Sequence, residues 1–269
     1  MLAIEARSAA QHILRRIAEG ERSDGNRQLV HFREHSWVRS AASLSSSKAL
    51  IGTSMVSIGT SVRVACGVTC EFAPVDPEKP TEGRISTTVT FPAICGASPE
   101  DVTRRRISDF VNSTFLSCLD LKQLVIVEGE VCWVLRIDVV VLEADGGLYD
   151  AAVSAVSQAL HKSNLPEVPL PDGSGNNTLS KPLALKRLPI CCTFAVVNDV
   201  VISDPDSQEL LVAQCECAIV LAAAPTAATA QLLSFTDFGG TPITDERIQE
   251  MATLAEIQRK ALVKLGYVA

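Results

Sequence analysis

The sequence has few aromatic residues, no long hydrophobic run and no excess of positive charge. Phe, Trp and Tyr make up 4% of the 269 residues, too few for the stacking platforms that bind single-stranded nucleic acid. The longest uncharged apolar run, around 218–229, is too short and too broken by Pro225 to span a membrane. Lys and Arg number 24 against 31 Asp and Glu, giving a net charge of -7, whereas proteins that bind duplex nucleic acid over their whole surface are usually basic. Nucleic-acid contact is therefore expected only at a local patch or within a larger assembly.

What the chain does contain is enough apolar material for a packed core. Hydrophobic residues make up 47% and charged residues 20%, which excludes disorder over most of the chain. The length lies between one and two typical domains. The N-terminal residues 1–20 lack the apolar core and cleavage site of a secretory signal. They predict instead an amphipathic helix, with Leu2, Ile13, Leu14 and Ile17 on one face.

The nine cysteines are expected to be free thiols, because their number is odd and no secretory signal precedes them. Three close groupings suggest a metal site at first: Cys66 with Cys70, Cys191 with Cys192, and Cys215 with Cys217. None has the two-residue spacing of a zinc knuckle, and no histidine pairs with them at ligand spacing. On a strand, Cys66 and Cys70 would share one face with Val64, Val68 and Phe72. We therefore predict buried cysteines acting as small hydrophobic residues, with no metal and no cofactor.

The hydrophobic pattern alternates between strand-like and helix-like segments. Strands are expected at 55–58, 62–72, 85–91, 124–127, 131–143, 191–197, 200–203 and near 211–222, and helices at 99–119, 148–162 and 244–265. Five prolines within 166–189 indicate a loop that divides the chain. Antiparallel hairpins followed by helices predict an α+β protein rather than a doubly wound parallel sheet.

Five short motifs occur in an order that is informative as a set. They are Arg22–Gly25 followed by Phe32-Arg33, the strand pair at 56–62, Leu119–Leu121, Cys132–Val139 leading to 145–151, and Leu165-Pro166. From about residue 20 to 265 the chain thereby resembles the RNase PH family, as used in the ring of the RNA exosome. The resemblance is greatest to its eukaryotic non-catalytic ring subunits. One departure is Asn26, which displaces the expected arginine to Arg27.

The resemblance implies the RNase PH fold, with duplicated strand-hairpin and helix units related to the ribosomal protein S5 domain 2-like fold, and mixed sheets covered by helices. It implies an N-terminal helix at 1–20, a first subdomain at 21–165, a linker loop at 166–188, and a second subdomain at 189–269 ending in a helix.

Catalytic members of the family hold inorganic phosphate with a Gly/Ser–Arg segment before the final helix. The matching residues 235–241 contain Asp237 and no Arg or Lys, and a carboxylate repels phosphate. Gly239 and Gly240 can offer backbone amides as an anion nest or form a plain glycine turn into the helix. The sequence favours the turn.

A group of acidic residues follows the strand expected at 200–203. Asp204, Asp206 and Glu209 resemble the Asp-Pro-x-x-x-Glu pattern of the inactive subunits, whereas active subunits place catalytic carboxylates at this strand end. Turn capping by Asp204 is the structural alternative. Together with the missing cation, this pattern implies that phosphorolytic activity has been lost.

Two basic segments are candidates for RNA contact. Arg104, Arg105 and Arg106 lie on the helix expected at 99–119 and cannot all be buried. They are expected to contact phosphates, to form ion pairs with a neighbouring subunit, or to be solvated. Arg84 is a weaker candidate.

The sequence therefore predicts a structural, non-catalytic subunit that helps to form the channel for single-stranded RNA. As the resemblance implies it, the partners are other RNase PH-like subunits of a hetero-hexameric ring, cap subunits and an associated nuclease, with no membrane. The implied process is RNA processing and degradation, ribosomal RNA included, in nucleus, nucleolus and cytoplasm. Two alternatives stay open: an active phosphate-dependent 3′ exoribonuclease, and a free-standing binding protein of the same fold.

Overall fold

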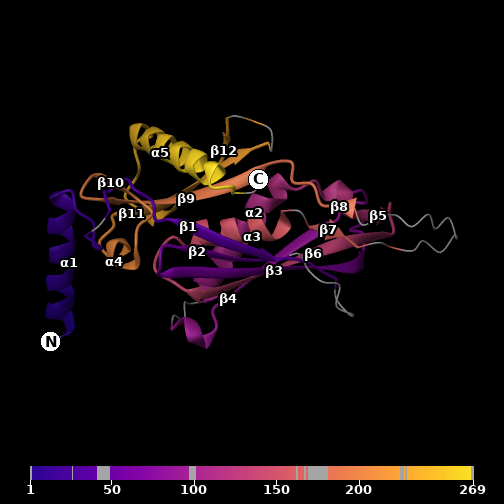
Figure 1. Ribbon diagram of the computed structural model, residues 1–269, viewed down its shortest axis with the longest axis horizontal. Coiled ribbons are helices and arrows are strands. Elements are labelled where there is room, and N and C mark those ends of the chain that lie inside the picture. The colour runs from indigo at the N-terminus through magenta and orange to yellow at the C-terminus, as the bar shows by residue number, and fades with distance from the viewer. Residues whose placement is uncertain are drawn as a thin grey trace.

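The computed structural model describes residues 2–25, 27–40, 49–96, 101–161, 163–166, 168, 181–224, 227 and 229–267. Four layers are stacked in the order sheet, helices, sheet, helix (Figure 1). Helices α2 (Asp101–Cys118) and α3 (Leu148–Leu160) lie between the two sheets, and α5 (Asp245–Lys264) covers the outer face of the second sheet. Helix α1 (Leu2–Ala18) lies at one end of the molecule.

The first sheet is built from the N-terminal half of the chain in the order β1-β2-β3-β6-β4. Its strands are β1 (His35–Ser40), β2 (Ala49–Ile58), β3 (Val62–Pro74), β4 (Arg84–Thr90) and β6 (Val131–Glu143), and the short β5 (Val125–Val127) pairs with β6. All pairings are antiparallel except β4 with β6. The 3-10 helices η1 (Ala93–Cys95) and η2 (Leu121–Leu124) follow β4 and α2.

Helix α3 is buried over almost its whole length because both sheets pack against it. Its small residues allow a close approach to β2. At Gly52 an added Cβ would lie 1.9 Å from the carbonyl oxygen of Ala159, so only glycine fits there.

The second sheet has the order β10-β9-β11-β12. Its strands are β9 (Leu188–Val197), β10 (Val200–Ser203), β11 (Cys215–Ala223) and β12 (Gln231–Gly240), with the one-turn helix α4 (Ser207–Leu210) after β10. Strands β7 (Asn164–Leu165) and β8 (Lys181–Pro182) form a separate short pair. No helix in the described part of the chain is long and apolar enough to cross a membrane.

Most of the expected elements are confirmed. The hairpins around Gly59 and Gly129 and the helix that begins after Thr244 are present, and Ile13 and Ile17 of α1 are buried. Cys66 and Cys70 are buried in β3 and form no disulfide, and burial raises the pKa of both thiols. The fold is α+β with mixed sheets, as expected.

Other expectations were wrong or incomplete. Phe72 is exposed because β3 extends beyond the helices, and it stacks on Trp133 instead. The strand expected near 211–222 begins only at Cys215, since α4 and its C-terminal turn precede it. Strands β1 and β12 were not expected. Much of the linker expected at 166–188 lies outside the described residues.

Candidate functional site

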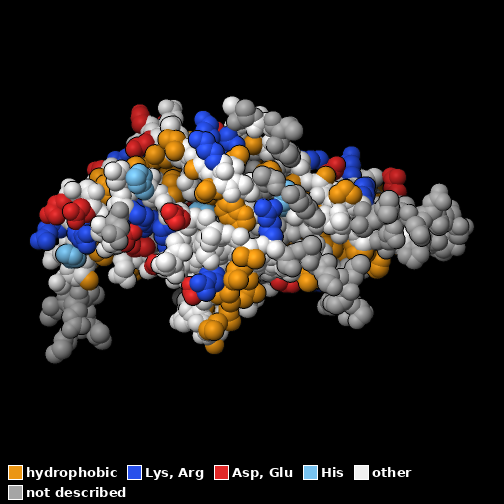
Figure 2. Space-filling view, in the orientation of Figure 1, with side chains coloured by type: hydrophobic (Ala, Val, Ile, Leu, Met, Phe, Trp, Pro, Cys, Tyr) orange, Lys and Arg blue, Asp and Glu red, His pale blue; other side chains and the backbone are white. Residues whose placement is uncertain are grey.

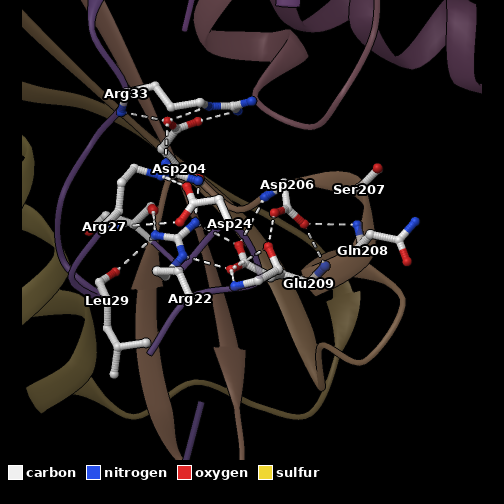
Figure 3. Close-up of polar contacts among 12 residues, drawn as sticks. Arg22, Asp24, Arg27, Leu29, Arg33, Asp204, Asp206, Ser207, Gln208 and Glu209 are labelled. Carbon is white, nitrogen blue, oxygen red and sulfur yellow. Dashed lines mark hydrogen bonds and ion pairs between the residues drawn. The ribbon is translucent and has the colours of Figure 1, made fainter. Parts of the chain in front are cut away.

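The acidic residues that follow β10 lie against the N-terminal segment that connects α1 to β1 (Figure 3). This segment carries Arg22, Arg27 and Arg33. All three arginines contact the turn between β10 and α4. Residues about 180 positions apart in the sequence thus form one polar cluster.

Arg22 and Glu209 form the most buried ion pair, with both side chains 0% exposed. Arg22 Nε and Nη2 donate to the two Glu209 carboxylate oxygens at 2.7 and 2.6 Å. The remaining donors reach the backbone carbonyls of Leu29, Ser203 and Asp204 at 3.3, 2.8 and 2.9 Å. A buried ion pair persists only when its other hydrogen bonds are satisfied, and this pair meets that requirement.

Asp204 is held by two further arginines. Arg33 donates from Nη2 to Oδ1 at 2.6 Å, and from Nε and its backbone amide to Oδ2, both at 2.8 Å. Arg27 Nη1 adds a bond to Oδ2 at 3.1 Å. Burial acts to lower the pKa of Arg33, but the bond and charge of Asp204 outweigh it and raise that pKa. Both carboxylate oxygens of Asp204 are therefore engaged by arginines of the same chain.

Asp206 is the capping residue of this turn, rather than Asp204. Its carboxylate accepts from the amides of Gln208 and Glu209 at 2.9 and 2.8 Å, and Glu209 accepts in return from the Asp206 amide at 3.1 Å. This reciprocal arrangement is a capping box. Ser23 Oγ also donates to Asp206. The cluster is continued by Asp145, which accepts from Ser207 Oγ at 2.6 Å.

A further carboxylate, Asp150, lies in the first turn of α3 and is buried. It accepts from the amide and hydroxyl of Thr193 at 2.9 and 2.6 Å. Burial raises the pKa of Asp150 to about 7, and the charge of Asp204 acts in the same direction. Burial lowers the pKa of His35, on β1, to about 4.

The candidate phosphate segment, residues 235–241, lies at the opposite edge of the second sheet from this cluster. In register, Ser203 pairs with Phe194, Phe194 with Cys217, and Cys217 with Asp237. Three strand spacings of roughly 4.8 Å therefore separate Asp237 from the end of β10, about 14 Å in all.

Within that segment, the glycines end β12 rather than form a free anion nest. The Gly239 amide donates to Asp237 Oδ1 at 2.8 Å, so that amide is occupied. At Gly240, φ is +122° and a Cβ would lie 2.0 Å from the carbonyl oxygen of Gln214. The carboxylates and the glycine amides thus do not converge on one substrate position.

The candidate RNA-contacting residues do not form a single patch. Arg104 pairs with Asp101 at 3.3 Å, whereas Arg105 and Arg106 are exposed on α2. The charge of Arg106 counteracts the burial that raises the pKa of Glu216 on β11. Arg84 donates to the carbonyl of Pro74 at 3.0 Å. It lies on the face of the first sheet opposite α2, so the structure does not bring it to the arginine run.

Sequence reasoning missed how these residues connect. Arg22, Arg27 and Arg33 stand at or beside motif positions in the sequence, but their partners Glu209 and Asp204 are distant in the chain. The capping box at Asp206 and Glu209 was the one local signal, because Asp-x-x-Glu before an apolar residue is typical of a helix start.

Comparisons with known proteins agree with this architecture. Residues 34–166 match domain 1 of the 3′ exoribonuclease family (RNase PH), and residues 187–258 match domain 2. The chain is 31% identical over 212 residues to the exosome complex component Rrp42 of Methanopyrus kandleri, covering 76% of this chain and 77% of that one. It is 30% identical over 156 residues to the exosome complex component RRP45 of Danio rerio, covering 54% of this chain and 39% of the relative.

A solved structure of the Archaeoglobus fulgidus exosome with RNA bound to the active site contains a chain with the same fold. The TM-score is 0.80 at 22% identity, covering 97% of this chain and 99% of that one. With both family domains matched in order and the fold reproduced over nearly the full length, the chain belongs to the RNase PH family of 3′ exoribonucleases.

Proposed function

We propose that this protein is a structural, non-catalytic subunit of an RNA exosome ring. In this role it pairs with sibling RNase PH-family subunits and helps to form the channel for single-stranded RNA that is processed from its 3′ end. The relatives named as exosome components support ring membership. Cap subunits and an associated nuclease complete the proposed assembly, with nucleus, nucleolus and cytoplasm as its expected locations.

The observation that carries the non-catalytic part is the engagement of the acidic cluster. Phosphorolysis needs a group that holds phosphate and an acid, base or metal site near the leaving oxygen. Here Asp204 and Glu209 accept hydrogen bonds from arginines, and Asp206 caps α4. The matching phosphate segment carries Asp237 on the opposite edge of the sheet. The carboxylates thus stabilise the fold. The phosphate segment contains no Lys or Arg that would attract phosphate.

Assembly is tested by native mass spectrometry of the complex that co-purifies with the tagged chain. We expect a ring that contains sibling RNase PH-family subunits. A chain that purifies as a monomer, unfolds cooperatively and does not bind such siblings would contradict ring membership. Cell fractionation tests the proposed locations.

Loss of catalysis is tested with Asp237→Arg, which places a cation at the exposed position of the phosphate segment. We expect no gain of phosphate-dependent RNA shortening, because the carboxylates remain about 14 Å away across the sheet. Activity in this variant would show that only the cation had been missing.

A further inference from the structure

A short extended segment, residues 181–187, runs past the C-terminal end of α2 and along η2. We call it the basic ribbon, because it presents three exposed cations: Lys181, Lys186 and Arg187. A fourth exposed cation, Lys122, lies beside it in η2. Figure 2 shows Lys and Arg side chains gathered at the end of the molecule where Figure 1 labels β8 and β5.

The backbone of the basic ribbon is held in place by the rest of the fold. The amide of Lys186 donates to the carbonyl of Cys118 at 2.9 Å. The Gln123 side chain donates to the carbonyl of Ala184 and accepts from its amide, both at 2.8 Å. Leu183 is buried, whereas the Lys186 side chain is 57% exposed. The ribbon is thus anchored from inside and carries its cations on the outside.

One carboxylate lies among these four cations. Asp120 pairs with Lys186 at 3.1 Å. The hydrogen bond from Lys186 lowers the pKa of Asp120, and the charge of Lys122 acts in the same direction, so Asp120 is ionised and offsets one positive charge. Lys181 and Arg187 form no ion pair with any residue that the structure describes. The patch is therefore strongly positive, although the whole chain carries a net charge of -7.

The other carboxylates at this end of the molecule belong to two turns, at 76–82 and 128–130. The two turns are joined to each other by a bond from the Gly129 amide to the Pro80 carbonyl, at 3.2 Å. Among the described residues, no hydrogen bond or ion pair joins either turn to the basic ribbon. The acidic turns therefore leave the cations of the ribbon unneutralised.

The composition of the patch fits a polyanion better than a protein surface. Protein interfaces have a core of large apolar side chains, and lysine is depleted in them. The exposed uncharged residues of the ribbon are only Pro182 and Ala184, and three of the four cations are lysines. Contacts from Lys and Arg to phosphates, by contrast, supply affinity for nucleic acid without reading its bases.

Stabilisation of the negative end of the α2 dipole is the structural alternative. It accounts for Lys186 and Arg187, whose amides bond to the last turn of α2. It does not account for Lys181, which lies on β8 and pairs with β7 instead. An exposed cation that neither a helix end nor a described carboxylate engages is available to a ligand.

We propose that the basic ribbon and Lys122 bind the phosphate backbone of single-stranded RNA. This contact is separate from the arginine run on α2, because Arg106 lies about 18 Å along the helix from Cys118, where the ribbon is bonded. The inference rests on the proposed function and adds to it a site on this chain.

The test measures how a fluorescein-labelled oligouridylate binds to the complex that co-purifies with the tagged chain, over a series of salt concentrations. The ribbon variant combines Lys122→Gln, Lys181→Gln, Lys186→Gln and Arg187→Gln. We expect its binding at low salt to be at least about tenfold weaker than that of the parent. The log–log salt slope should fall by up to roughly 3, at about 0.7 for each of four phosphate contacts.

A matched control removes the same number of charges from exposed positions on α1 and α5. It combines Arg7→Gln, Arg15→Gln, Lys260→Gln and Lys264→Gln. We expect this control to keep the salt slope and the RNA affinity of the parent. A fall of the slope in both variants alike would mean that net charge, and not the ribbon, determines binding.

Lys181→Gln alone keeps every described ion pair and should lower the slope by about 0.7, so the site stays testable if the fourfold variant fails to assemble. An intact ring whose slope changes in neither variant would overturn the RNA contact and leave the proposed function standing. Loss of a protein subunit from the ribbon variants but not from the control would also overturn it, because the ribbon would then bind protein. If no sibling co-purifies with the unmodified chain, the proposed function fails, and the same titration on the chain alone still tests the ribbon.

Discussion

Two arginine-rich regions of this molecule use their charge in opposite ways. Around β10, Arg22, Arg27 and Arg33 are largely buried and are bonded to carboxylates and carbonyls of the same chain. On α2, Arg105 and Arg106 are exposed. The difference indicates that the first region fixes the fold, whereas the second is available to something outside it.

The largest effect is expected from breaking the buried pair. Arg22→Ala leaves Glu209 charged and buried, which should cost about 3–5 kcal/mol of folding free energy. The matched control is Arg247→Ala, which breaks an exposed pair with Asp199 and should cost less than about 1 kcal/mol. Urea unfolding measures both. Equal losses of folding free energy in the two variants would mean that Arg22 is not a structural residue.

The second prediction concerns pH and Asp150. The pKa of this acid is raised to about 7 in the folded chain, whereas an unfolded aspartate titrates near about 3.9. Between about pH 3.9 and pH 7 the folded state therefore holds a proton on Asp150 that the unfolded state has lost. The stability gained from this proton falls by up to about 1.4 kcal/mol per pH unit and is lost as pH rises through 7.

Asp150→Asn removes this contribution, so the variant should gain stability relative to the parent as pH rises from 4 to 7. His35, whose pKa is lowered to about 4, acts in the opposite direction between about 4 and 6.5. The difference between the two chains in urea unfolding isolates the contribution of Asp150. A difference that does not change with pH would show that Asp150 is charged in the folded chain throughout.

The smallest effect is expected from the exposed arginines. Replacing Arg104, Arg105 and Arg106 by Ala should change folding stability by less than about 1 kcal/mol, because exposed ion pairs contribute little. If they contact RNA in the assembled ring, the log–log salt slope of binding should fall by up to roughly 2, at about 0.7 per phosphate contact.

Arg105→Ala alone sharpens this test, since Arg104 pairs with Asp101 and Arg106 interacts with Glu216. An intact ring with unchanged RNA affinity at low salt would eliminate the channel role. A ring that loosens would instead indicate contact with a neighbouring subunit.

The elements that could be predicted from the sequence have local signals. Alternating apolar residues and turn glycines define the hairpins, and a helical stripe at Ile107, Phe110 and Phe115 defines α2. Helix α4 has four residues, too few to show a period. The parallel pairing of β4 with β6 depends on tertiary contacts and has no local signature.

The candidate site was harder to predict, because its contacts are also tertiary and have no local signature in the sequence. Arg22 and Glu209 are 187 residues apart, and neither neighbourhood indicates the other. The acidic pattern at 204–209 predicted where the carboxylates lie, but only the fold shows which arginines engage them. Asp204 holds the N-terminal segment, and Asp206 performs the capping that the sequence suggested for Asp204.

The most direct test of the central claim, that this acidic cluster holds the fold together and does not catalyse, is release of nucleoside diphosphates from 3′-ended RNA in the presence of phosphate. We expect none from the purified chain, and no change in the activity of an assembled ring when this subunit carries Asp237→Arg. Phosphate-dependent release by the unmodified chain, abolished by Asp204→Asn in a variant that still folds, would contradict the account.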